Sequence, residues 1–287
     1  MLLFYCSFPL LWLLSKLPFR VLIGLSDFLS FLLEHLIRYR RNVVEANLRK
    51  AFPNESDASL KNIRSQFYTH LADRIFETIK MITVTKEELL KRVTFLNPEL
   101  ATNFLKQGRS VIAVMGHCGS WEMACLAASA YLPDLYLYSV YTPVNNHSFN
   151  NFFKEVRSRF GMHLFSMKEM IPMLRNGFGE PAIGMYVADQ GHSNPRRAYW
   201  RQFLNQDTNF MTGPARFCKA HDAAFIYVQI LQTERMKYRI HPILLSESPQ
   251  RFSEEQLTDM FVEELTNQIK KSPADWLWSH KRWKHHR

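Results

Sequence analysis

The segment Ser110–Ala124, which reads SVIAVMGHCGSWEMA, decides the fold that we expect for this chain. Its first part, Val111–Met115, is a short apolar run rich in β-branched residues, which is typical of a fully buried strand. Gly116 and Gly119 allow the chain to turn sharply after that strand. The residues from Trp121 onward are typical of a helix. The segment therefore predicts a buried strand, a tight turn and a helix.

The turn and the first helical turn carry His117 and Glu122, a pair suited to acid–base chemistry. A histidine at the carboxyl end of a buried strand projects into the crevice where open α/β sheets bind ligands. A carboxylate across the turn can fix the ring's tautomer and raise its basicity, so the other nitrogen can take a proton from a hydroxyl. We expect His117 to act as general base and Glu122 to orient it. The alternative is a structural pair that caps the turn.

From residue 93 onward, short apolar runs alternate with helical stretches. This alternation predicts an α/β fold in which helices flank a mixed central sheet. We expect strands at 111–115, 135–141, 182–187, 225–231 and 238–244. We expect helices at 42–52, 58–81, 120–131, 147–160, 168–176, 214–221 and 253–271.

Residues 1–41 contain two apolar runs, Met1–Ser15 and Val21–Ile37, the second of which is interrupted by charged residues. Each run is shorter than the roughly 20 apolar residues of a spanning helix, and no signal-peptide cleavage site follows the first. The basic cluster at residues 38–41 suits an anionic cytoplasmic leaflet. We expect 1–41 to form a membrane anchor, either one tilted span or a hairpin in the interface, and 42–287 to form one catalytic domain. The alternative is a hydrophobic helix packed on the core.

The composition of the 287-residue chain excludes a disordered protein, because 47% of its residues are hydrophobic. The net charge of +10 suits an anionic membrane surface or an acidic partner. No nucleic-acid-binding motif is recognisable, so we expect no nucleic-acid partner. The four cysteines have no paired or metal-like spacing, which indicates a reducing compartment and no metal site.

The box GHCGSWE, residues 116–122, resembles the "His, four residues, acid" box of glycerolipid and lysophospholipid acyltransferases. Its Gly-His-x-Gly-x-Trp-Glu form is similar to that of the bacterial lipid A late (secondary) acyltransferases. Three further boxes resemble that branch and extend the likeness over essentially the whole chain. They are Ala188-Asp-Gln190, Thr212-Gly-Pro-Ala215 and Trp276-Leu-Trp-Ser-His-Lys-Arg-Trp-Lys284.

This resemblance implies an acyltransferase fold and an O-acyltransferase activity without cofactor or metal. The implied donor is acyl carrier protein, or acyl-coenzyme A, and the implied acceptor is a hydroxyl of a lipid A precursor. The implied location is the cytoplasmic face of the bacterial inner membrane. Direct transfer is implied, whereas the adjacent Cys118 and Ser120 raise the alternative of an acyl-enzyme intermediate.

The resemblance also implies roles for three later residues. Arg157 would bind an acceptor phosphate or support the oxyanion; the alternative is a solvated helix face. Asp189 and Gln190 follow the strand at 182–187, so we expect them at the same sheet edge as His117. Asp189 would orient Arg157 or bind acceptor hydroxyls, unless it only initiates a turn.

Two features leave the substrate open. The phrase Tyr141-Thr-Pro143 stands where many relatives have Tyr-Arg-Pro, which puts a phosphorylated acceptor in doubt. The boxes do not separate lipid A enzymes from relatives that acylate other glycolipids, aminolipids or lysophospholipids. An alternative from another class is a non-catalytic membrane lipid-binding protein, against which the intact pair of His117 and Glu122 argues.

In the last box, we expect the tryptophans to pack on the core and the cations to face lipid headgroups; the alternative is a surface helix.

Overall fold

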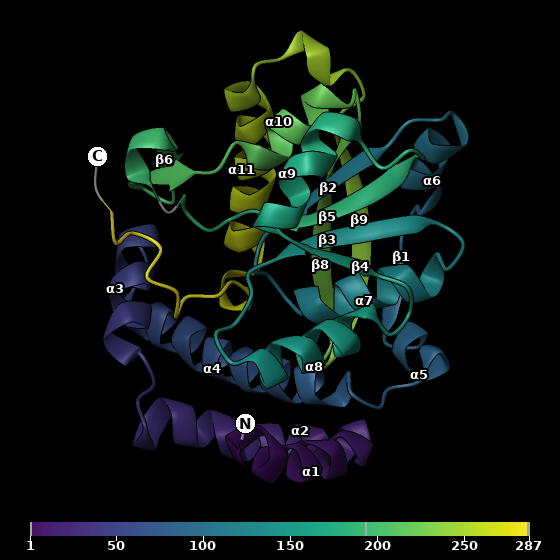
Figure 1. Ribbon diagram of the computed structural model, residues 1–287. Helices are drawn as coiled ribbons and strands as arrows, with labels where there is room; N and C mark the ends of the chain where they lie inside the picture. The colour runs from purple at the N-terminus through teal and green to yellow at the C-terminus, as the bar shows by residue number, and fades with distance from the viewer. Residues whose placement is uncertain (1, 193, 286–287) are drawn as a thin grey trace.

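A seven-stranded sheet forms the centre of the computed structural model, which describes residues 2–192 and 194–285 (Figure 1). The strand order is β1-β9-β8-β2-β5-β3-β4, and all neighbours are parallel except β8 and β9. The predicted α/β fold with a mixed central sheet is therefore confirmed. The strands are β1 (Val93–Phe95), β2 (Val111–Met115), β3 (Tyr136–Tyr141), β4 (His163–Ser166), β5 (Ala182–Val187), β8 (Ala224–Glu234) and β9 (Lys237–Ser246).

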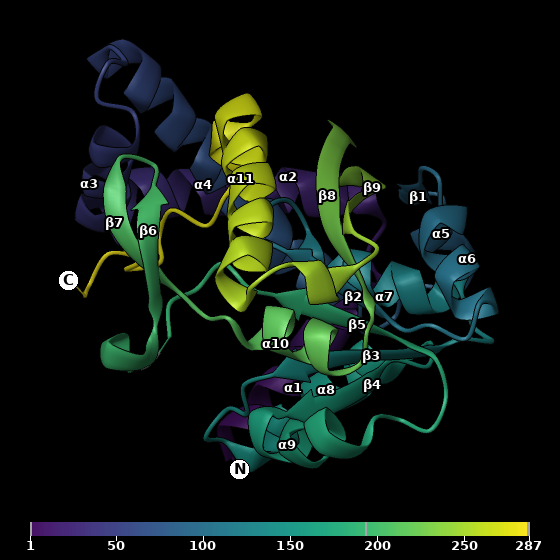
Figure 2. The same cartoon turned by 90° about the horizontal axis from the view of Figure 1, so that it is seen from above.

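Two layers of helices cover the sheet, because alternate side chains of its buried strands point to opposite faces (Figures 1 and 2). Ala113 of β2 packs in the cluster that contains residues of α6, α7 and α8. Val114 packs in the other cluster, with residues of α9, α10 and α11. These helices are α6 (Glu99–Lys106), α7 (Trp121–Tyr131), α8 (His147–Ser158), α9 (Met167–Asn176), α10 (Gly213–Ala220) and α11 (Glu254–Lys271).

The N-terminal helices lie along α4, at the bottom of the view in Figure 1. In α2 the buried residues, Phe19, Leu22, Ser26 and Ser30, follow a helical spacing, so one side of the helix packs on the protein. The elements before the sheet are α1 (Leu2–Lys16), α2 (Phe19–Phe31), the π-helix η1 (Leu32–Leu36), α3 (Arg41–Ala51), α4 (Asp57–Lys80) and α5 (Lys86–Leu90).

The charges that interrupt the second apolar run bind the rest of the protein. Asp27 forms an ion pair with Arg235 at 2.5 Å. Glu34 is buried and accepts a hydrogen bond from Arg64 at 3.2 Å. Among the residues that the structure describes, no helix combines the length and apolarity needed to cross a bilayer, so the expected span is not found. The interfacial alternative and the division into 1–41 and 42–287 stay predictions.

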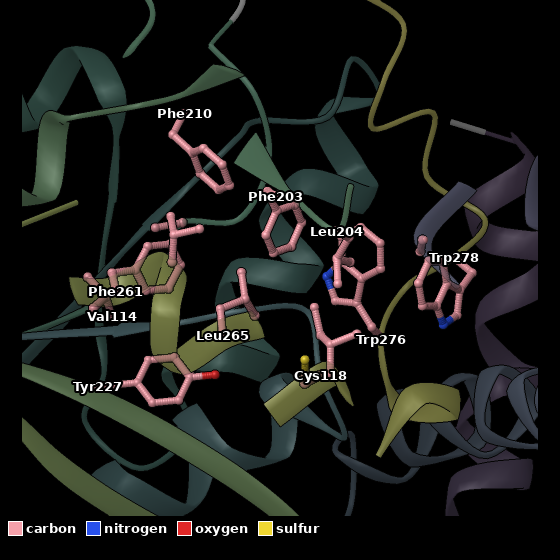
Figure 3. Close-up of a cluster of buried hydrophobic side chains, with 14 of the residues drawn as sticks. Val114, Cys118, Phe203, Leu204, Phe210, Tyr227, Phe261, Leu265, Trp276 and Trp278 are labelled. Carbon is pink, nitrogen blue, oxygen red and sulfur yellow. The ribbon is translucent and has the colours of Figure 1, made fainter. Parts of the chain in front are cut away.

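A small hairpin and the C-terminal segment complete the fold beside α11 (Figure 2). The hairpin consists of β6 (Tyr199–Phe203) and β7 (Gln206–Phe210), which pair antiparallel. We call residues 276–283 the C-terminal strap; they follow a 3-10 turn at Pro273–Asp275 and contain no helix. Its three tryptophans are buried, as predicted, and Figure 3 shows Trp276 next to Cys118 within the core. The alternative of a surface helix is wrong. The expectation that the cations of this box face lipid headgroups is also wrong for Arg282, which is buried and donates a hydrogen bond to the Asn209 carbonyl.

Candidate active site

Two adjacent parallel strands bring His117 and Asp189 together. Strand β2 pairs with β5 up to Met115 and Val187, and the Ala188 amide donates a hydrogen bond to the Met115 carbonyl at 2.9 Å. In each strand the second residue beyond the carboxyl end is polar, His117 after β2 and Asp189 after β5. The prediction that Asp189 lies at the same sheet edge as His117 is confirmed.

The Asp189 carboxylate binds the imidazole ring directly. The distance from His117 Nδ1 to Asp189 Oδ1 is 2.5 Å, and the His117 backbone N–H donates to Oδ2 at 3.0 Å. Trp276 Nε1 donates to the same Oδ2 at 2.7 Å. Burial opposes ionisation of this carboxyl, but the His117 charge and these hydrogen bonds outweigh it and lower the pKa of Asp189 to about 2. A charged acceptor therefore faces Nδ1, which places the proton of a neutral ring on Nδ1.

Glu122 binds Arg157, so the predicted pairing of Glu122 with His117 is wrong. Arg157 Nε donates to Glu122 Oε2 at 2.7 Å, and Arg157 Nη2 donates to Oε1 at 2.5 Å. The expectation that Asp189 orients Arg157 is wrong for the same reason. Glu122 lies in the first turn of α7, beside the last turn of α8 that carries Arg157. Burial opposes the charge of this guanidinium, but the Glu122 carboxylate raises its pKa above the ordinary value.

His117, Glu122 and Arg157 line one cavity of about 330 Å³, and the buried Asp189 reaches it only through the His117 ring. Gln190 also lines it, and its side-chain amide nitrogen lies 3.3 Å from His117 Nε2. The edge of the Trp121 indole meets the imidazole, with ring centroids 4.7 Å apart. The sequence alone predicted no role for Trp121, although its aromatic ring lies within the histidine box and so close to the expected base. The cavity thus presents one ring nitrogen, one amide and one guanidinium to a substrate.

A second cavity of about 300 Å³ adjoins the first, because the two share five lining residues. Its remaining lining is mostly apolar and includes Met170, Ile171 and Phe217. The shared residues are Val140, Tyr141, Thr142, Val187 and Met211. The cavity that holds the ionisable groups therefore adjoins a more apolar one.

The glycines around His117, from which the sequence predicted a sharp turn, also permit close packing. A Cβ atom on Gly116 would collide with Leu265 Cδ1 and would lie 3.5 Å from Asp189 Oδ2. Gly119 has φ of +57°, and a Cβ there would meet Ile230 Cγ2 at 2.9 Å. The turn can thus lie directly on the core.

Cys118 does not face this cavity as a reactive thiol. Its side chain is buried, and burial raises the pKa of the thiol well above its ordinary value. A protonated, enclosed thiol is a weak nucleophile, which disfavours an acyl-enzyme on this residue. Within the described residues, no group of three or more His, Cys, Asp or Glu side chains is arranged to hold a metal ion.

Comparison with known proteins agrees with the geometry. The model of the bacterial lipid A biosynthesis acyltransferase family matches residues 2–285. A lipid A biosynthesis acyltransferase from Haemophilus influenzae (strain ATCC 51907 / DSM 11121 / KW20 / Rd) is 21% identical over 272 residues, which cover 93% of this chain and 83% of the relative. The chain therefore belongs to the bacterial lipid A biosynthesis acyltransferase family and is an acyltransferase.

Proposed function

We propose that the protein transfers a fatty acyl chain from a thioester donor to a hydroxyl of a lipid A precursor. The observation that carries this proposal is the His117–Asp189 pair, which leaves Nε2 of the ring at a cavity. The family and the Haemophilus relative support the acceptor, since the relative is named for lipid A biosynthesis.

The reaction needs one base at the acceptor hydroxyl. The hydroxyl takes the place of the Gln190 amide at His117 Nε2 and gives its proton to that nitrogen. The oxygen then attacks the thioester carbonyl carbon, so a C–O bond forms and the C–S bond breaks. The imidazolium returns the proton to the departing thiolate. Asp189, charged and buried, stabilises the imidazolium while it exists.

Arg157 supplies positive charge next to that base. Glu122 takes the Nε–H and one N–H of Nη2, so the two N–H groups of Nη1 and the second N–H of Nη2 can donate to a substrate oxygen. The bidentate pair fixes the plane of the guanidinium before substrate binds. We assign Arg157 to the thioester oxyanion or an acceptor phosphate, and we assign Glu122 to holding Arg157 in place.

The adjoining apolar cavity suits the acyl chain of the donor. Its lining of methionine, isoleucine and aromatic side chains can bury methylene groups, each worth about 0.8 kcal/mol when removed from water. We propose acyl carrier protein as the donor's carrier, because that partner is acidic and this protein carries a net charge of +10. Acyl-coenzyme A is the other donor of the same chemistry.

We further propose that the N-terminal helices lie in the surface of the inner membrane, at its cytoplasmic face. In α2 the exposed apolar residues Val21, Phe28 and Phe31 lie on the opposite side from the buried stripe that packs on α4. Further large apolar side chains, Leu10, Trp12, Leu13, Leu36 and Ile37, are exposed on α1, η1 and the turn that follows. Apolar groups next to cations such as Arg20 and Arg38 are typical of an interfacial anchor.

The first test is mass spectrometry of total lipids from a deletion strain that is complemented with variants. We expect His117→Ala to leave lipid A lighter by one acyl chain, whereas His241→Ala, on β9 outside the cavity lining, restores the native mass. Full complementation by His117→Ala would overturn the acid–base role. If lipid A is unchanged but another lipid has lost an acyl chain, that other lipid is the acceptor. If no lipid changes at all, the result favours the alternative of a non-catalytic protein.

A further inference from the structure

The Asp189 carboxylate receives hydrogen bonds from two different parts of the chain. His117 supplies its ring N–H to Oδ1 and its backbone N–H to Oδ2. The third donor is the indole N–H of Trp276, which binds Oδ2 at 2.7 Å. Trp276 lies 159 residues after His117 in the sequence. Trp276 is therefore the donor to Asp189 that does not belong to His117 itself.

The C-terminal strap holds this indole in a fixed place. Trp276 is 2% exposed and packs edge-on against Trp278 and Phe203, with ring centroids 4.7 Å and 5.8 Å apart. Its backbone forms a bridge with Cys118, next to His117. The strap is also bound to α3, because the Asn47 amide donates to two of its carbonyls.

The torsion of an aspartate carboxylate about Cβ–Cγ is soft, so its orientation depends on its hydrogen bonds. A donor on Oδ2 from a rigid neighbour fixes the plane of the carboxylate and thereby the direction in which Oδ1 meets the ring. A buried carboxylate that loses a donor is also less well compensated for its charge. Both effects act on the base through Asp189, without contact between Trp276 and the substrate.

We propose that Trp276 is a positioning residue for the reaction, which holds Asp189 in the orientation that keeps His117 Nε2 directed at the cavity as a base. This inference rests on the proposed function of His117. It gives the last sequence box a role beyond packing. Trp278 and Trp283 in the same strap are also buried, but their indole N–H groups bind Pro273 and Thr208 instead of Asp189.

Trp278 provides a matched control. It lies in the same strap, is fully buried and donates its indole N–H to the Pro273 carbonyl at 2.5 Å, away from Asp189. Replacing the indole nitrogen of either tryptophan by sulfur, through incorporation of benzothienylalanine, removes one buried N–H and preserves the ring shape. Each substitution thus removes one buried indole hydrogen bond from the folded protein, but only the substitution at Trp276 removes a hydrogen bond to Asp189.

The experiment measures kcat and KM of the full-length enzyme in detergent, with acyl carrier protein that is loaded with mixed saturated fatty acids and a lipid A precursor that lacks one chain. We expect the sulfur isostere at Trp276 to lower kcat by about 10- to 100-fold, the range for a lost hydrogen bond to a charged group. KM for both substrates should stay within about twofold, because Trp276 contacts neither. The isostere at Trp278 should leave kcat within about twofold.

Equal kcat values for the two isosteres, or a raised KM with unchanged kcat at Trp276, would overturn the inference. Thermal unfolding of both proteins shows whether their loss of stability is the same, so that a difference in kcat is not a difference in folding. His117→Ala is measured alongside. If His117→Ala keeps full activity, the proposed function fails. If His117→Ala is inactive but the isosteres at Trp276 and Trp278 have equal kcat, only the role of Trp276 fails.

Discussion

The exchange of Asp189 for asparagine tests the central pair most directly. Asparagine has the same shape, but one oxygen becomes an NH2 group that can only donate. The remaining oxygen is best placed toward the His117 backbone N–H and the Trp276 indole, both of which are donors. The NH2 group then faces His117 Nδ1, which must accept. The proton of the ring moves to Nε2, and the nitrogen at the cavity can no longer act as a base.

The expected loss follows from this tautomer. An aspartate-to-asparagine change that imposes the wrong tautomer on a catalytic histidine lowers kcat by about 10,000-fold, or about 5 kcal/mol of transition-state stabilisation. Glu122→Gln should cost only about tenfold, because the glutamine still accepts one hydrogen bond from Arg157 and does not touch the ring. The ratio of the two effects distinguishes the observed pairing from the one that the sequence predicted.

The assay is acyl transfer with purified variants, with folding checked by thermal unfolding. Asp259→Asn serves as the control, because this carboxylate also receives several donors, from Tyr199 and Arg201, but lies outside the cavity lining. We expect it to keep kcat within about twofold. A larger loss in Glu122→Gln than in Asp189→Asn would refute the reasoning and reinstate Glu122 as the partner of His117.

Three further results are expected. Because its pKa falls from 3.8 to about 2 on folding, Asp189 contributes about 2 kcal/mol of stability above pH 4. About half of this contribution is lost by pH 3, so the free energy of unfolding in urea should fall less between pH 5 and pH 3 in Asp189→Asn than in the native protein. An equal fall in both proteins would contradict this. Phe28→Ser combined with Phe31→Ser should reduce flotation with anionic vesicles several-fold, and unchanged flotation would exclude α2 from the contact. Gly116→Ala should lower the free energy of unfolding by about 1–3 kcal/mol, whereas Gly24→Ala, with open space around its Cβ, should not.

Much of the sheet was predictable because most of its strands are short apolar runs that can be recognised in the sequence. Strands β2 and β5 have the bounds predicted, since each is bounded by turn residues and buried on both faces. The hairpin β6–β7 was missed because its strands are rich in Arg, Gln, Asp and Asn and lack an apolar run. The hairpin packs on the strap through Phe203 against Trp276 and Phe210 against Arg282, and these tertiary contacts are not visible in the local sequence.

The residues of the site were predictable, but their pairing was not. His117, Glu122 and Arg157 do line one cavity, and Asp189 does lie at the predicted sheet edge. Which carboxylate meets the ring depends on the order of strands in the sheet, a long-range property that spacing along the chain does not contain. Only four residues separate His117 from Glu122 in the sequence, but the neighbouring strand places Asp189 in direct contact with the ring.

The position of the C-terminal strap has a consequence for biosynthesis. Trp276 is translated 87 residues after Asp189 and 159 residues after His117. A growing chain can therefore pair β2 with β5 and bring the imidazole to the carboxylate before the third hydrogen-bond donor has been synthesised. The acid–base pair is complete only when the strap has been translated and has packed on the core.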